Sequence, residues 1–156
     1  MFRLTMIIFI ALMIGLSPAY AAQDYSRRLD SVLESLKKQL AEKKPEFTHR
    51  SIEPIKGSRN VSVNNWESAD CGVRVSIIAY GSREEAATAM RQSLAFGIKK
   101  LPDLGDGGYS WGMGGSNIGF RKDDLTIWIS GPEKAAVSKE FAELVACAIP
   151  APVFCF

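Results

Sequence analysis

The chain has 156 residues, with 19 basic and 17 acidic side chains, one histidine and three cysteines. This length accommodates one domain with a sizeable core and hardly two. The near-neutral charge argues against a dedicated nucleic-acid binder, whose affinity comes from clustered Lys and Arg facing phosphates. The single histidine excludes two-histidine metal motifs and most zinc sites, and we expect neither a metal nor another cofactor.

Residues 1–21 have the parts of a secretory signal peptide. Arg3 supplies the positive start, residues 4–16 form an apolar run, and Ala19-Tyr20-Ala21 offers the small-x-small pattern of a cleavage site. The run is shorter than the about 20 residues of a membrane-spanning helix, and no cysteine follows it for lipid attachment. We therefore predict a periplasmic or secreted protein that begins near Ala22, without stable membrane insertion.

Three cysteines lie after the predicted cleavage site: Cys71, Cys147 and Cys155. An odd number in an exported chain allows one disulfide with a spare thiol, an intermolecular disulfide, or none. The sequence slightly favours Cys147–Cys155, because prolines kink the short segment between them. Cys71–Cys155 or Cys71–Cys147 would close a longer loop and constrain the unfolded chain more. All three pairings stay open.

The first predicted element of the mature chain is an amphipathic helix over residues 22–44. Asp24 or Ser26 can cap it, and Pro45 ends it. One face carries apolar residues at helical spacing: Leu29, Val32, Leu33, Leu36 and Leu40. Such a stripe is typical of a helix that faces a core. The polar connecting segment 45–58 leaves loose docking on a partner as the alternative.

From Arg59 onward, apolar residues recur at every second position instead of at helical spacing. We place the start of the core domain, predicted over residues 59–149, at this change. Alternating apolar residues over 61–66 and 73–79 predict an antiparallel hairpin. Ser82 and Glu85 then form a capping box for a second helix. We expect this helix to end near residue 100, before Pro102.

The second half of this domain repeats the order of hairpin and helix. Residues 118–130 predict a hairpin with its turn over 122–124, and a last helix runs from Glu133 to Pro150, where the tail 150–156 begins. The predicted fold is α+β, an antiparallel sheet of two hairpins with three helices packed on it.

Residues 105–119 hold seven glycines and no helix signal, so we expect a loop. No phosphate-loop fingerprint is present, and two aspartates without a further acidic cluster are a weak calcium signal. Turns that need positive φ explain the glycines at least as well as a ligand loop does. If the loop binds a ligand, the candidate residues are Tyr109, Trp111 and Asp106.

Trp128 lies in the second hairpin on the face opposite Leu125, Ile127 and Ile129. Either the first helix covers that face and Trp128 is core, or Trp128 joins Trp111 in an exposed aromatic platform. We expect it to be buried, because the stripe of the first helix needs a surface to pack on.

If the protein is an enzyme, Cys71 or a hydroxyl would be its nucleophile and His49 its base. No nucleophile signature is present, and Asp70 disfavours a thiolate at its neighbour. His49 lies in an expected edge strand or loop, where a solvated histidine is ordinary. The sequence therefore assigns no catalytic residue.

Two segments carry a resemblance: LGDGGY at residues 104–109 and IGFRKDDLTIWIS at 118–130. They resemble small exported bacterial proteins of unknown function in which LGDxAY precedes an FRKG-type hairpin and a helix rich in Ala and Phe. The resemblance implies a Mog1/PsbP-like α/β/α sandwich and supplies no catalytic residues. The chain departs from the pattern at Gly108, where Ala is usual, and at Asp123-Asp124 in place of the turn glycine.

The leading hypothesis is an exported, non-enzymatic binding or accessory domain of the bacterial envelope, with an unknown protein or small-molecule partner. One alternative is a small hydrolase or thiol enzyme that uses Cys71 or a hydroxyl with His49. Another is a protein-interaction factor that docks through its first helix.

Overall fold

The computed structural model describes residues 18–52, 58–93 and 98–149, with the backbone alone for residues 18–24. The helices are α2 (Pro18–Lys43), α3 (Arg83–Gln92), α4 (Ala135–Ala148) and a short 3-10 helix, η1 (Met113–Gly115). The strands are β1 (Thr48–Ser51), β2 (Val61–Glu67), β3 (Gly72–Ala79), β4 (Lys99–Leu101), β5 (Gly108–Trp111), β6 (Asn117–Lys122) and β7 (Leu125–Ser130). Among the described helices, none has the length and apolar character needed to cross a membrane.

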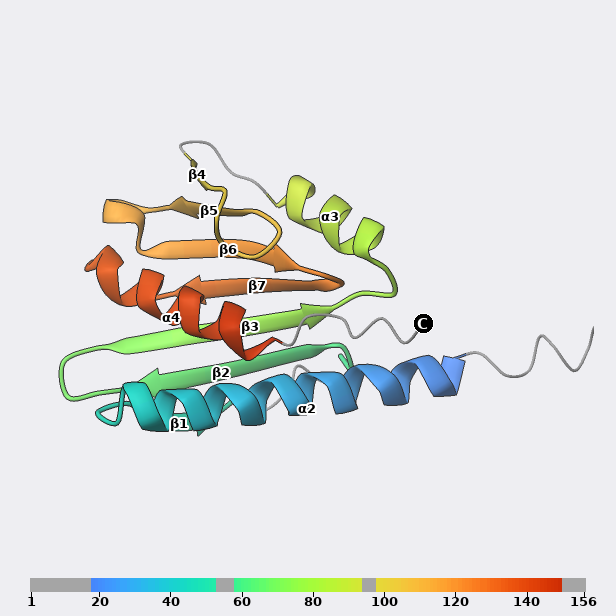
Figure 1. Cartoon of the computed structure of the whole chain (residues 1–156), viewed down its shortest axis with the longest axis horizontal. Coiled ribbons are helices and arrows are strands. Elements are labelled where there is room, and N and C mark those ends of the chain that lie inside the picture. The colour runs from blue at the N-terminus through green and yellow to red at the C-terminus, as the bar shows by residue number, and fades with distance from the viewer. Residues whose placement is uncertain (1–17, 53–57, 94–97, 150–156) are drawn as a thin grey trace, which may run out of the picture.

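All seven strands form one antiparallel sheet in the order β1-β2-β3-β7-β6-β5-β4 (Figure 1). The two predicted hairpins, β2–β3 and β6–β7, form its centre and are joined by the pairing of β3 with β7. The α+β class is therefore confirmed. The sheet is wider than the two predicted hairpins, because β1, β4 and β5 extend it at both edges. Strand β1 lies within the segment 45–58 that was expected to be a connection.

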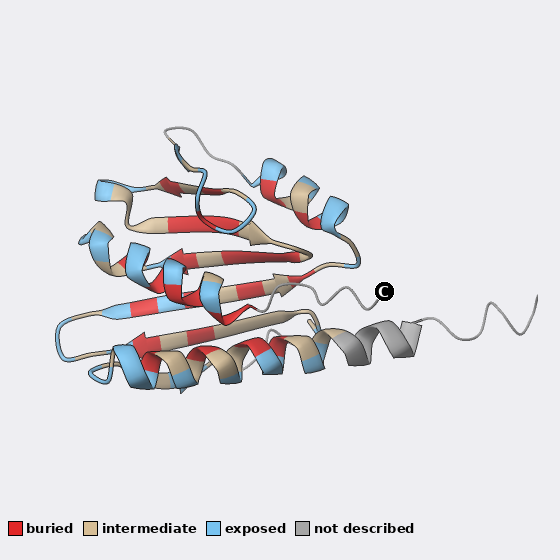
Figure 2. Cartoon of the chain, viewed as in Figure 1, coloured by how far each residue is buried: buried red, intermediate tan, exposed pale blue. Residues whose placement is uncertain are grey.

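One face of the sheet is apolar along its central strands and is covered by α2 and α4. Val73, Val75 and Ile77 of β3 point to this face, and the register places Ile127 and Ile129 of β7 among them. These side chains are at most 1% exposed (Figure 2). We call this face the α2–α4 face. The intervening residues point to the other side, because side chains alternate along a strand.

The apolar stripe of α2 packs into this core and not away from it. Its buried members are Leu29, Val32, Leu36 and Leu40, and Leu33 is partly buried beside them. The helix ends at Lys43, before Pro45, as predicted. It begins at Pro18, earlier than the expected caps Asp24 and Ser26. Proline is compatible with this position, because the first turn needs no N–H donor.

Helix α3 packs against β6 and β7 from the opposite side. Ala86 and Met90 are buried there, and neither belongs to the core cluster beneath α2 and α4. Thr126 of β7, which points away from the α2–α4 face, is fully buried as well. The helices therefore lie in two layers with the sheet between them. We call this second side the α3 face.

The expectation that Trp128 is buried under the first helix is wrong. Helix α2 covers the face of Ile127 and Ile129, whereas Trp128 is half-buried on the α3 face. Its ring lies 5.7 Å from the ring of Trp111, edge to face. A Cβ at Gly119 would lie 2.6 Å from Cζ3 of Trp128. The absent side chain of Gly119 thus makes room for the indole.

The second helix begins as predicted but ends much earlier. The N–H of Glu85 donates to Oγ of Ser82 at 3.1 Å, so the predicted cap is confirmed. The helix ends at Gln92, not near residue 100, and the N–H of Ser93 bonds the Ala89 carbonyl oxygen to close it. Residues 99–101 instead form β4, which pairs with the edge of β5.

The expectation of a loop over residues 105–119 is also wrong, because this stretch contains β5, η1 and the start of β6. Gly108 and Ser110 of β5 point to the α2–α4 face and alternate with Tyr109 and Trp111. A Cβ at Gly108 would lie 3.0 Å from Cβ of Phe120. A side chain at residue 108 would therefore fit tightly, and the glycine breaks the alternation of apolar and polar residues that predicts a strand.

Replacing Leu36 by alanine is expected to lower the free energy of unfolding by about 2–5 kcal/mol, as for other fully buried leucines. Leu36 is 0% exposed. Urea denaturation followed by circular dichroism measures the change. Lys38→Ala, at an exposed position of the same helix, is the control and should shift the value by less than about 0.5 kcal/mol. Equal effects of the two variants would contradict the packing of α2 on the sheet.

Candidate functional site

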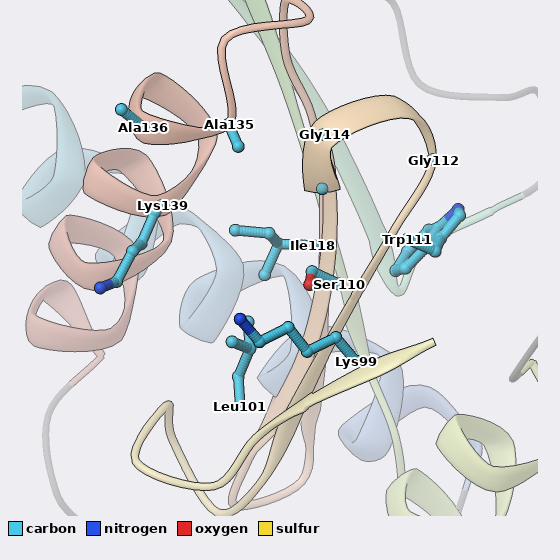
Figure 3. A pocket seen from close by; sticks show the side chains of 11 residues that line it. Lys99, Leu101, Ser110, Trp111, Gly112, Gly114, Ile118, Ala135, Ala136 and Lys139 are labelled. Atoms are coloured by element: carbon cyan, nitrogen blue, oxygen red, sulfur yellow. The ribbon is translucent and has the colours of Figure 1, made fainter. Parts of the chain in front are cut away.

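An open cleft lies on the α2–α4 face, between the edge hairpin β4–β5 and the first turns of α4. Its volume is about 400 Å³, and we call it the β5–α4 cleft. The lining side chains used below are Lys99, Leu101, Ser110, Ile118, Ala135 and Lys139 (Figure 3). The first four share one side of the sheet, because β4, β5 and β6 pair in register.

Ser110 is the polar side chain in the floor of the β5–α4 cleft. The residue is 9% exposed, and its hydroxyl points into the space between β5 and α4 (Figure 3). No hydrogen bond to this hydroxyl is present among the described residues. The hydroxyl oxygen is reached by solvent through the open cleft, unlike Oγ1 of Thr126, which is buried without a partner. Ser110 therefore offers a hydrogen-bond donor and acceptor at the base of the cleft.

The charges that line the described cleft are all positive. Lys99 reaches in from β4, and Lys139 stands on the wall formed by α4. Helix α4 adds to this potential, because its first turn holds no acidic residue and its N-cap, Lys134, makes no side-chain cap. A helix N-terminus carries roughly half a positive charge. The cleft thus combines a positive potential with a hydroxyl at its base.

The rim of the cleft is the tight connection from β5 to β6 through η1. Gly112, Gly114 and Gly115 all adopt positive φ angles there, which favours glycine over other residues. A Cβ at Gly115 would lie 3.6 Å from Oγ of Ser110 and 3.8 Å from Cβ of Ala135. A side chain at this position would therefore occupy the cleft, and glycine keeps it open.

The structure does not gather the three predicted ligand residues in one place. Trp111 lines the β5–α4 cleft, but its indole points away from it, toward Trp128 on the α3 face (Figure 3). Tyr109 points to the same face as Trp111. Asp106 pairs with Arg121 at 2.9 Å, outside the cleft lining.

Asp106 belongs to a charged network around the β6–β7 turn. Its carboxylate accepts the N–H of Asp123 at 2.7 Å. Arg28 of α2 donates to the Asp123 carboxylate at 3.0 Å, and Arg83 of α3 donates to its other oxygen. Asp123 also adopts a positive φ of 58°, which aspartate tolerates better than most residues. This network ties the helices of both layers to one turn and has a structural role.

The two aspartates of this turn have opposite pKa shifts. Burial raises the pKa of Asp123, but the hydrogen bonds from Arg28 and Arg83 outweigh it, and the net shift is downward. Burial raises the pKa of Asp124 above its ordinary value, against the attraction of the Arg28 charge. Arg28 also forms an ion pair with Asp124 at 2.5 Å, but burial outweighs this attraction, so the charge of Asp123 stabilises the fold more than that of Asp124.

His49 belongs to a hydrogen-bonded chain and not to a nucleophile–base pair. Its Nε2 lies 2.8 Å from Oδ1 of Asn64, and the amide nitrogen of Asn64 donates to Oγ of Ser62 at 2.8 Å. The imidazole also packs on Trp66, with ring centres 5.0 Å apart. Because Asn64 is buried, this chain satisfies its amide. No contact of His49 with Cys71 is present among the described residues.

The two cysteines that the structure describes, Cys71 and Cys147, are not bonded to each other. Cys71 is half-buried, with its Sγ 3.6 Å from Oγ of Ser68, and Cys147 is exposed at the end of α4. They do not form the predicted alternative Cys71–Cys147 bridge. Cys155 lies outside the described residues, so the pairings that involve it stay predictions.

A second cleft, of about 510 Å³, lies beside Cys71 and the first half of α4. It has mixed charges, and Lys44 forms an ion pair with Glu140 across it. The hydrogen bond to Glu140 raises the pKa of Lys44 above its ordinary value. Acidic side chains outnumber the two lysines in the lining of the second cleft, so it lacks the uniformly positive lining of the β5–α4 cleft.

Comparisons with known proteins assign no family to the chain. No protein-family model and no curated protein matches it. Among solved structures, the crystal structure of a GTP binding regulator from Thermotoga maritima is similar at 12% identity, with a TM-score of 0.46. The match covers 78% of this chain and 86% of that chain. A likeness at this level carries no argument about function.

Replacing Asp123 by asparagine is expected to lower the free energy of unfolding at pH 7 by about 1–3 kcal/mol, because it removes charged hydrogen bonds. The lowered pKa of Asp123 means that its contribution is present above pH 3.8 and is lost as the pH falls through the folded-state pKa. The difference between wild type and variant should therefore shrink in acid. Urea denaturation at pH 7 and at pH 3 measures it.

Asp124→Asn is the matched control for that experiment. Because the pKa of Asp124 is raised, removal of its charge should leave stability at pH 7 unchanged or increased. Equal losses for the two variants would contradict the assignment of the stabilising charge to Asp123.

Proposed function

We propose that this chain is an exported, non-enzymatic binding or accessory domain of the bacterial envelope, and that its ligand site is the β5–α4 cleft. The observation that carries the proposal is the unpartnered hydroxyl of Ser110 at the base of a cleft lined by Lys99 and Lys139. Small-ligand sites are typically concave, with a few polar groups on apolar walls. Leu101 and Ile118 supply such walls here.

The alternatives have less support from the described residues. A hydrolase or thiol enzyme would need a nucleophile beside His49, whose partner is Asn64. An interaction factor that docks through the apolar stripe of α2 would first have to remove that stripe from the core.

Export and the Mog1/PsbP-like sandwich remain parts of our proposal. The sandwich is supported by the helices that pack on both sides of the antiparallel sheet.

Export predicts a mature protein that begins at Ala22. Intact-mass measurement and N-terminal sequencing of the protein from an envelope fraction should find residues 1–21 removed. Ala21→Leu, which replaces the small residue before the cleavage site, should leave the precursor uncleaved. A full-length wild-type chain recovered from the cytoplasm would contradict export and leave the cleft proposal standing.

The ligand site is tested by filling the cleft. Ala135→Phe, and independently Ala136→Phe, should abolish retention of small molecules by the purified protein, because both positions line the cleft. Mass spectrometry of the molecules released on denaturation measures retention. Ala87→Phe on α3, outside the cleft lining, is the control and should retain what the wild type retains. Unchanged retention by folded Ala135→Phe and Ala136→Phe would place the ligand elsewhere.

A further inference from the structure

We propose that the β5–α4 cleft binds a tetrahedral oxyanion, the phosphate group of a small phosphorylated molecule or free phosphate. This inference rests on the proposed function and names the chemistry of its ligand. It assigns Ser110 as a hydrogen-bond donor to the anion and Lys99 and Lys139 as its counter-charges.

The Ser110 hydroxyl is the first argument for an anionic ligand. Neighbouring side chains on the same side of the sheet, Leu101 and Ile118, are apolar. Within the described residues the hydroxyl has no hydrogen-bond partner, and solvent reaches it through the open cleft. A ligand oxygen would replace water as its acceptor, and a charged oxygen forms the stronger bond.

The second argument is the charge around this hydroxyl. Among the described residues Lys99 has no ion-pair partner, and it points into the cleft (Figure 3). The ammonium of Lys139 lies 3.8 Å from Glu143, one turn along the same exposed helix surface. Such a pair contributes little in water, so Lys139 is able to turn toward a ligand. The uncapped first turn of α4 adds a positive end at the rim.

The shape of the donor set favours phosphate over a carboxylate. Carboxylates are best bound by the planar fork of arginine, which this cleft lacks among its described lining residues. The Lys99 ammonium and the Ser110 hydroxyl face the cleft as separate donors (Figure 3). Lys139 would add a third donor after leaving Glu143. Separate donors of this kind suit a tetrahedral group. A cleft of about 400 Å³ exceeds the volume of an oxyanion, so the rest of a small ester fits beside Leu101.

Isothermal titration of the mature wild-type protein tests the inference with four probes: inorganic phosphate, glycerol 3-phosphate, acetate and glycerol. The two phosphates should bind, glycerol should not, and acetate should bind at least tenfold more weakly than phosphate. Affinity should fall as salt increases, because charged groups carry it. Tighter binding of glycerol 3-phosphate than of inorganic phosphate identifies an ester as the ligand, and the reverse order identifies free phosphate.

Variants connect that binding to the cleft. Ser110→Ala, Ser110→Cys and Lys99→Gln should each weaken phosphate binding by about tenfold, since each removes one charge-assisted contact. Lys139→Gln should have a smaller effect, because its ammonium must first leave Glu143. Lys38→Gln and Ser130→Ala, at exposed positions, are the matched controls and should bind as the wild type does. Circular dichroism confirms that each variant is folded.

Several outcomes would overturn the inference. These are no binding of either phosphate, equal binding of acetate and phosphate, or wild-type affinity in both folded Ser110 variants and in Lys99→Gln. A neutral molecule that is retained by the wild type and lost from Ala135→Phe would also overturn it. That last result would leave the proposed binding function intact, so the two failures are distinguishable.

Discussion

The burial of one sheet face beneath α2 and α4 is the constraint on which the rest of the structure depends. Four residues of the α2 stripe and the inward residues of β3 and β7 form one continuous core. A surface of this kind contributes most of the favourable free energy of folding. It also occupies the apolar stripe of α2, so this stripe is not a free interaction surface. The part of the same face under β4 and β5 lies at the edge of the sheet, where α4 only begins, and there the β5–α4 cleft remains open.

The charged turn of the β6–β7 hairpin connects the two helical layers. Asp123 accepts hydrogen bonds from Arg28 of α2 and from Arg83 of α3, which pack on opposite sides of the sheet. Asp106, a candidate ligand residue by sequence, is held in the same network. Its carboxylate therefore serves the fold, because Arg121 and the Asp123 N–H already occupy it. Residues 105–119 therefore contribute to two separate features: the charged network at one end of β5, and the cleft beside Ser110 that we propose as a ligand site.

The site predicted from the sequence and the cleft that we propose as a ligand site overlap in position and differ in chemistry. Aromatic residues in a glycine-rich stretch suggested a binding loop, and this stretch does form the rim of the cleft. The aromatic rings themselves point to the α3 face, because they alternate with Gly108 and Ser110 along β5. Lys99 and Ser110 had no signal that sequence reasoning could use. A small polar residue inside a strand reveals its role only when the packing around it shows that the hydroxyl has no partner.

Local patterns in the sequence by themselves determined the α+β class, the two central hairpins, the α2 stripe and the cap of α3, since each depends on periodicity or on neighbouring residues. The end of α3, the strand β5 and the identity of the helix that covers the Trp128 side of the sheet were decided only by the tertiary structure. Those features depend on pairing partners distant in the chain, such as β4 with β5 and Gly119 with Trp128. The cleft was decided in the same way, because Lys99, Ser110 and Lys139 come from three elements that meet only in the folded chain.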